Sequence, residues 1–196
     1  MMKQVVLLFL IVMTTYTLPA QKKKLSESEI QFLEGNYQTS TALLEQLLEG
    51  LPDSQWRKRP AKGSWSIQET MEHVILAMTA QIKGLEKALS TKSDEFKDLR
   101  NRDGWLLSKI ADRGVRVKTP LEPTGNDLSK EAMMEEYRIH GARFLDILRD
   151  KKTEFRNHYG NSPYGEVDAY QLMIFIPGHI QRHLSQMEEI LRALES

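Results

Sequence analysis

The chain has 196 residues, with 27 basic and 27 acidic side chains, five histidines and no cysteine. Its balanced charge provides no positive field to recruit phosphate, so we expect no nucleic acid partner. Without cysteine it can form neither a disulfide framework nor a thiolate metal site, and any metal must be held by nitrogen and oxygen. The length fits one ordinary domain with a proper core.

The amino terminus has the pattern of an export signal. Lys3 provides a positive start, residues 5–13 form an unbroken apolar stretch, and Ala20 is a small residue before the expected cut. The apolar run is shorter than the ~20 residues that span a bilayer, so we expect no stable membrane insertion after cleavage. The sequence predicts a signal peptide over residues 1–20, a domain over residues 21–196 and a periplasmic or secreted location. An uncleaved leader or a buried first strand is the alternative.

Four long stretches predict amphipathic helices, because their apolar residues recur at three- and four-residue steps. The first spans about residues 27–50, and the second starts at the capping box Ser66-Ile67-Gln68-Glu69, where serine and glutamate satisfy each other's helix-end donors. The third spans about residues 129–149, and the fourth runs from an N-cap at Asp168 to the end.

A long linker joins the second and third predicted helices. It contains a short helical pattern near residues 105–111 and then the proline-rich segment 119–125. No stretch shows convincing strand alternation. We therefore predict an all-α fold, a four-helix bundle with a long crossover between its second and third helices. Such bundles build cofactor sites in the core from facing helices.

His179 and His183 are spaced i and i+4 in the last predicted helix, so both imidazoles lie on one face. That face is the buried one, since apolar residues recur along it: Leu172, Ile176, Met187, Ile190 and Leu194. A buried imidazole must find a partner for each ring nitrogen. A divalent metal would partner both rings at once, and this spacing is typical of helical zinc motifs.

A third ligand could come from three further histidines. His73 lies early in the second predicted helix, off its main apolar stripe but on a flank of small residues that would leave space for a metal and its water. His140 lies among charged residues, which is typical of a surface histidine, and His158 lies in a turn-like segment where it could hydrogen-bond locally. Spacing alone therefore supports only the pair on the last helix.

These features together resemble the DinB/YfiT-like superfamily. The resemblance rests on Trp65-Ser66-Ile67-Gln68-Glu69 followed by His73, and on His179 and His183 with Gln186 one turn on. It extends over most of the mature chain. Members are four-helix bundles in which one histidine of the second helix and two of the last bind a divalent metal. The resemblance thus implies His73, His179 and His183 as metal ligands.

Three imidazoles suit zinc, nickel, copper or iron, and we expect zinc or nickel. Neutral ligands leave the metal its full charge, so it can lower the pKa of a bound water or polarise a carbonyl. The resemblance implies related chemistry, because some members are thiol-dependent transferases or isomerases. Their thiols are cytoplasmic, so the export signal favours a metal-dependent hydrolase or transferase acting on an extracytoplasmic small molecule. The alternative is a non-catalytic bundle that binds metal or a partner outside the cytoplasm.

Two residues near the predicted site on the last helix each allow two interpretations. Gln186 could orient a ligand or touch substrate, or could simply be a polar residue at the edge of the apolar stripe. Pro177 removes one backbone hydrogen bond and kinks its helix. The kink could be tolerated on an exposed side, or it could aim His179 at the metal.

The residues around His73 offer no clear general base. Glu69 is explained by capping, and we expect Glu72 to be solvated and Trp65 to pack at the helix start. We therefore assign no base. The apolar surface of four helices also makes a homodimer plausible.

Overall fold

The computed structural model describes residues 24–112, 114 and 120–195, and the predicted signal peptide lies outside them. Ten elements follow in chain order: α1 (Glu27–Glu49), α2 (Asp53–Trp56), α3 (Ile67–Leu89), the 3-10 helix η1 (Arg100–Arg102), α4 (Asp103–Ala111), α5 (Lys130–Leu148), the 3-10 helix η2 (Phe155–Asn157), β1 (Tyr159–Ser162), β2 (Gly165–Asp168) and α6 (Ala169–Glu195). None of the described helices is long and apolar enough to cross a membrane.

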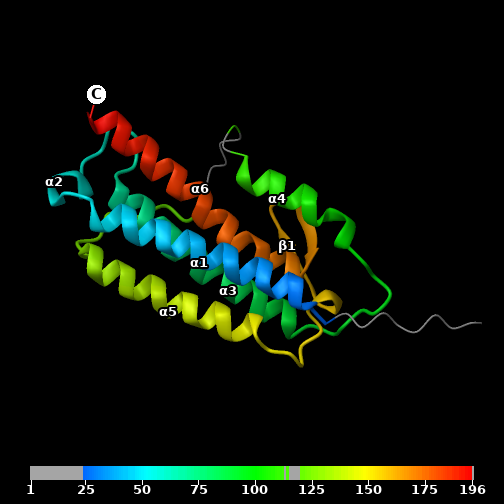
Figure 1. Ribbon diagram of the computed structural model, residues 1–196. Coiled ribbons are helices and arrows are strands. Elements are labelled where there is room, and N and C mark those ends of the chain that lie inside the picture. Colours follow the sequence, from blue (N-terminus) through cyan, green and yellow to red (C-terminus); the bar gives the residue numbers. More distant parts are fainter. Residues whose placement is uncertain (1–23, 113, 115–119, 196) are drawn as a thin grey trace, which may run out of the picture.

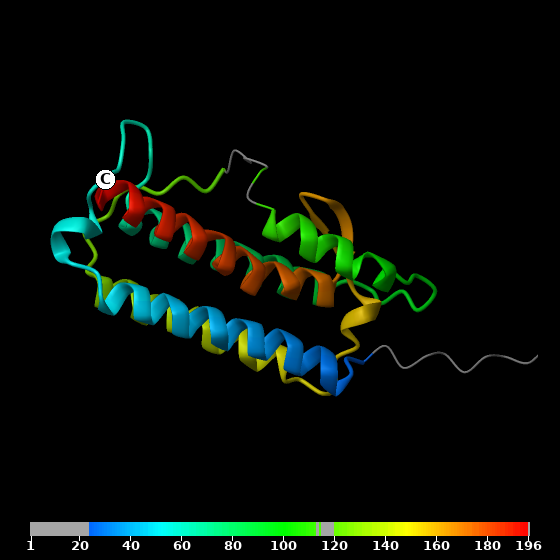
Figure 2. The same ribbon diagram turned by 45° about the horizontal axis from the view of Figure 1, so that its top comes forward.

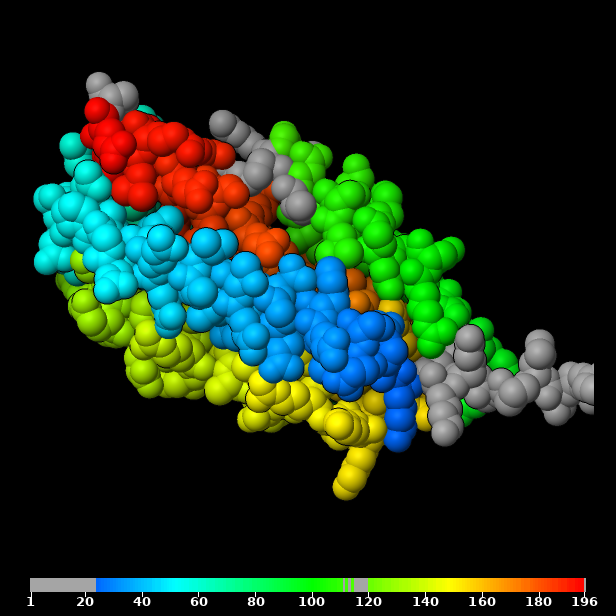
Figure 3. All heavy atoms as spheres, viewed as in Figure 1, coloured from blue at the N-terminus to red at the C-terminus, as the bar shows by residue number. Residues whose placement is uncertain are grey.

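The long helices α1, α3, α5 and α6 form a four-helix bundle (Figures 1 and 2). α1 and α6 run in one direction and α3 and α5 in the other. Each helix contacts two others, in the pairs α1–α6, α6–α3, α3–α5 and α5–α1. Because α3 and α5 run in the same direction, the chain between them must return along the whole bundle. This confirms the predicted crossover, and it places α4 against α6 on the way, as Figure 3 shows in green beside orange and red.

The helix boundaries follow the capping residues in the sequence. Ser26 with Glu29 and Ser66 with Glu69 form complete capping boxes at the starts of α1 and α3. Ser129 caps α5 by accepting from the N–H of Ala132. These caps satisfy backbone donors that the first helical turn leaves unpaired, which explains why the sequence located the helix starts to within a residue or two.

Two glycines allow helices to approach closely. A Cβ at Gly141 would lie 1.6 Å from the hydroxyl oxygen of Tyr37, so only glycine lets α5 pack against α1 at this point. A Cβ at Gly178 would lie 2.7 Å from Cγ2 of Ile110, where α4 packs against α6. The apolar core lies between all four long helices and continues under α4.

The structure contains elements that the sequence did not predict: the strands β1 and β2, the short helix α2 and the 3-10 helices η1 and η2. β1 and β2 form an antiparallel hairpin in which Ser162 pairs with Gly165, whose φ of 90° suits glycine at the turn. Each strand has only four residues, too few to show alternation. The hairpin is a minor addition to a mostly helical molecule.

A buried ionic cluster holds the hairpin, α1, α4 and α6 together. Arg156, which is 3% exposed, donates to Glu29 at 2.5 Å, to Asp103 at 2.7 Å and to Asp168 at 2.9 Å. The N–H of Gln171 in turn donates to Asp168 at 2.8 Å, which caps α6 as predicted. We call these five residues the Arg156 cluster.

Candidate metal centre

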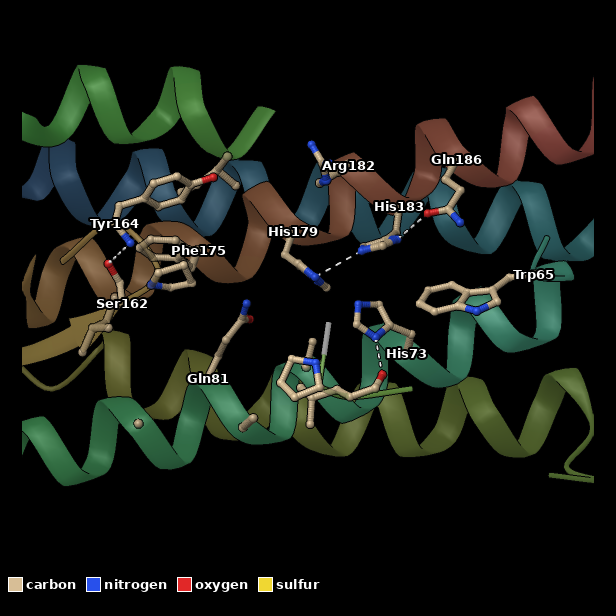
Figure 4. A pocket seen from close by; sticks show the side chains of 18 of the residues that line it. Trp65, His73, Gln81, Ser162, Tyr164, Phe175, His179, Arg182, His183 and Gln186 are labelled. Atoms are coloured by element: carbon tan, nitrogen blue, oxygen red, sulfur yellow. Dashed lines mark hydrogen bonds between the residues drawn. The ribbon is translucent and has the colours of Figure 1, made fainter. Parts of the chain in front are cut away.

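Three histidines from two facing helices come together in the bundle. His73 comes from the first turns of α3, and His179 and His183 come from consecutive turns of α6. Their ligating nitrogens all lie within 4.8 Å of one another, and the Nε2 atoms of His179 and His183 are 3.1 Å apart. Figure 4 shows the three rings pointing toward a common space. These residues, which we call the histidine group, could hold a metal ion.

His73 and His183 each make a hydrogen bond through Nδ1, the nitrogen that points away from the histidine group. This leaves Nε2 of each ring free to donate a lone pair to a metal. Nδ1 of His73 lies 2.8 Å from the carbonyl oxygen of Leu121, and Nδ1 of His183 lies 2.9 Å from Oε1 of Gln186. Because an oxygen of this kind only accepts, each Nδ1 carries the proton and each Nε2 is left unprotonated. A partner behind the ring is the usual arrangement for metal-ligating histidines.

Burial keeps all three rings neutral. Burial lowers the pKa of His73, and burial together with the neighbouring His73 and Arg182 lowers the pKa of His179 to about 3. Burial and the two other rings lower the pKa of His183 to about 2. Neutral imidazole is the form that binds metals. The three rings are therefore prepared to donate lone pairs at neutral pH.

The donor set fits a divalent metal with an open coordination position. Tetrahedral zinc–nitrogen bonds of about 2.0–2.1 Å would separate ligand nitrogens by about 3.3 Å, close to the 3.1 Å between His179 and His183. Within the described part of the chain, no aspartate or glutamate joins the histidine group. Three protein ligands without a carboxylate in the fourth place match the pattern of catalytic zinc sites.

The segment after α4 folds over α3 beside His73, and Glu72 holds it there. The Glu72 carboxylate accepts from the N–H and hydroxyl of Thr124, at 2.9 and 2.6 Å, and from the N–H of Gly125 at 2.9 Å. Burial would raise the pKa of Glu72, but these hydrogen bonds outweigh it and the pKa is lowered. Our expectation that Glu72 is solvated was therefore wrong. These hydrogen bonds hold in place the segment whose Leu121 carbonyl orients His73.

A cavity of about 1010 Å³ opens from the histidine group and runs along α3 and α6. Trp65 lines one end, with its ring centroid 5.0 Å from that of His73. Tyr164 of the hairpin loop and Phe175 line the other end, and Gln81 points into the space between (Figure 4). Trp65 therefore does more than pack at the helix start. We call this space the histidine cavity.

The other candidate residues occupy different surroundings. Pro177 is buried, which excludes a kink on an exposed side. His140 is half-buried and lies 3.0 Å from the hydroxyl of Thr79, so it is not a simple surface histidine. His158 lies 3.1 Å from the carbonyl oxygen of Thr91, a partner far away in sequence. Neither histidine belongs to the histidine group.

Sequence reasoning missed Gln81 and the Leu121 carbonyl. Gln81 lies eight residues after His73, about two helical turns along the same side of α3, and this spacing could have indicated it. The Leu121 carbonyl has no sequence signal, because any residue carries one.

Comparison with known proteins gives three matches. The family model of the DinB superfamily matches residues 36–187. The uncharacterized protein YuaE of Bacillus subtilis (strain 168) is 30% identical over 160 residues, which cover 76% of this chain and 90% of YuaE.

The third match is a solved structure. It is described as "YfiT from Bacillus subtilis is a probable metal-dependent hydrolase with an unusual four-helix bundle topology", and it superposes with a TM-score of 0.61 at 14% identity, over 89% of this chain and 93% of that one. At this identity the likeness shows the fold, a YfiT-like four-helix bundle. Since the family model spans most of the chain, the protein belongs to the DinB superfamily.

Proposed function

We propose that this protein is a metal-dependent hydrolase of a small molecule and that His73, His179 and His183 bind the metal. One observation carries the proposal: three neutral imidazoles face one another at the wall of a large cavity, and no described carboxylate joins them as a ligand. YfiT, a protein of the same fold, is described as a probable metal-dependent hydrolase. A divalent metal, zinc or nickel in our proposal, would polarise a carbonyl or activate water.

The chain's own residues would prepare this chemistry. Leu121 and Gln186 hold the outer nitrogens of His73 and His183, which fixes the ring orientation before a metal binds. Burial keeps the rings neutral. The cavity supplies space for a substrate next to the histidine group. Gln186 thus acts, in this proposal, behind the ligand and not on the substrate.

Elemental analysis of protein purified from its native compartment tests the metal ligands. We expect about one zinc or nickel per wild-type chain and none in His183→Ala, because two imidazoles are too few for a catalytic zinc site. His140→Ala is the matched control and should keep its metal, since His140 lies outside the histidine group. Stoichiometric metal in His183→Ala would overturn the ligand assignment.

Hydrolysis itself needs a second measurement. A panel of small esters and amides should show turnover that a chelator abolishes and the added metal restores. Bound metal without turnover of any panel member would favour the non-catalytic alternative.

We further propose that the protein acts outside the cytoplasm, on the strength of the signal-like pattern over residues 1–20. Mass spectrometry of the purified mature protein should find Gln21 as its first residue. An intact Met1 on cytoplasmic protein would contradict export.

A further inference from the structure

Gln81 places an unpaired polar atom in the histidine cavity. Its Oε1 is buried and accepts no hydrogen bond from any described residue. The side chain rises from α3 into the space between Phe175 and His179 (Figure 4). Buried acceptors are nearly always paired. A site built this way favours a ligand that brings its own donor, an N–H or O–H, to this point.

The cavity beyond Gln81 is lined mainly by aromatic and apolar side chains, with Asn161 and Ser162 of the hairpin as polar members. The rings of Tyr164 and Phe175 stack there with centroids 6.0 Å apart and an interplanar angle of 22°. Leu172 and Ile110 complete this part of the wall. Flat, parallel aromatic surfaces of this kind accept an apolar or aromatic arm of a ligand.

The described lining carries no net charge. Its charged side chains are Arg182 and Glu189, one of each sign, and Arg182 already donates to the carbonyl oxygen of Asp112. Arg182 keeps its charge in that bond, and a metal held by three neutral rings would keep its own, so a charged part of a ligand would find a counter-charge only close to Arg182, Glu189 or the histidine group. Gln81 and the aromatic residues Tyr164 and Phe175 are uncharged, which favours a neutral group of the ligand beside them.

The histidine group, Gln81 and the aromatic end follow one another along the cavity. In this order they suit the carbonyl, the N–H and the nitrogen substituent of a secondary amide. We propose that the cavity binds a neutral secondary amide whose N–H donates to Oε1 of Gln81. Its apolar nitrogen substituent lies against Tyr164 and Phe175, and its carbonyl faces the histidine group; this last placement rests on the proposed function. An ester or thioester has no donor at the position that faces Gln81. Gln81 is thus a specificity-determining residue.

The reaction that follows is amide hydrolysis. The oxygen of water forms a bond to the carbonyl carbon and the carbon–nitrogen bond breaks. The nitrogen leaves with a proton as an amine, so the products are a carboxylic acid and an amine with an apolar substituent.

Binding of two isosteres by the zinc-loaded full chain tests the proposal. N-benzylacetamide carries the N–H, and 4-phenylbutan-2-one has a methylene in its place, so their affinities differ through this one group. In Gln81→Leu we expect the dissociation constant of the amide, divided by that of the ketone, to rise about tenfold over the wild-type ratio, because one hydrogen bond is lost. Calorimetry measures both constants. Gln81→Met serves in the same way should the leucine variant unfold.

Gln38→Leu is the matched control, since Gln38 lies exposed on α1 away from the cavity, and its ratio should equal that of the wild type. An unchanged ratio in both Gln81 variants, or no saturable binding of the amide by the wild type, would overturn the amide site.

Release of benzylamine from N-benzylacetamide is measured separately. A Gln81-dependent ratio without hydrolysis of any panel substrate would leave the amide site standing and refute the hydrolase. Turnover of esters with an unchanged ratio of dissociation constants would support the hydrolase and refute the amide site.

Discussion

The molecule buries two polar clusters that differ in how their atoms are satisfied. In the Arg156 cluster, a guanidinium donates to carboxylates from three segments, so the cation and its anions are all part of the chain. In the histidine group, three neutral rings turn nitrogens toward one another, and Nε2 of His179 lies 3.1 Å from Nε2 of His183. Such nitrogens repel unless a proton or a cation lies between them.

The two clusters also differ in what lies beside them. The Arg156 cluster joins α1, α4, the hairpin and α6 and borders no large cavity, whereas the histidine group lines a cavity of about 1010 Å³. Polar burial alone therefore does not identify a site. An incomplete donor set beside open space does.

Breaking the Arg156 cluster should give the largest effect. We expect Arg156→Leu to lower the free energy of unfolding by about 3–5 kcal/mol, because it leaves the buried Asp168 carboxylate uncompensated. Urea unfolding measures this loss. The exposed pair of Arg143 with Glu86 is the control, and Arg143→Leu should cost less than about 1 kcal/mol. Equal losses in the two variants would show that the cluster is not a major structural element.

Metal should stabilise the wild type through the histidine group alone. At a free zinc concentration of about 100 times Kd, binding to the folded state adds about 2.7 kcal/mol to the free energy of unfolding. His183→Ala should lose this gain while its metal-free stability stays near that of the wild type. Thermal unfolding with and without zinc tests both statements, and His140→Ala should behave as wild type. A zinc response retained in His183→Ala would place the metal elsewhere.

Glu72 should affect metal affinity without touching the metal. We expect Glu72→Gln to weaken zinc binding about tenfold, because it loosens the segment whose Leu121 carbonyl orients His73. Competition with a chromophoric chelator gives the affinity. Glu188→Gln, on the exposed side of α6, should leave it unchanged. Equal affinities in the wild type and Glu72→Gln would remove Glu72 from this role.

The pH dependence of Glu29 should be the smallest effect. Burial would raise the pKa of Glu29, but hydrogen bonds from Arg156 and Ser26 outweigh it, so the folded-state pKa lies below 4.5. Its contribution is thus complete above about pH 4.5 and is lost as the pH falls through the lowered value. Glu29→Gln should be less stable than the wild type at pH 7, and the difference should narrow below pH 4.5. Urea midpoints across pH test this, and a constant difference would contradict it.

Local signals explain how much of the fold could be predicted. The capping box at Ser66, the N-cap at Asp168 and the helical spacing of apolar residues located all four long helices, because these signals act within one or two turns. The hairpin was missed because its four-residue strands depend on pairing between β1 and β2 and on packing against α3 and α6. The helix α2 is too short to carry a periodic pattern.

The sequence by itself determined the four helices, the pairing of His179 and His183 on one helix face, and the exclusion of a cysteine site, since spacing and composition are properties of the chain alone. Only the tertiary structure decided the surroundings of His73 and Glu72. The sequence placed His73 off the main apolar stripe of α3 and predicted Glu72 to be solvated. The segment 120–128 covers this side of the helix, so residues 66–75 are buried all round it. The apolar periodicity of a helix indicates only the face that packs against the core. It cannot predict that a loop about fifty residues away in the sequence covers another face of the same helix.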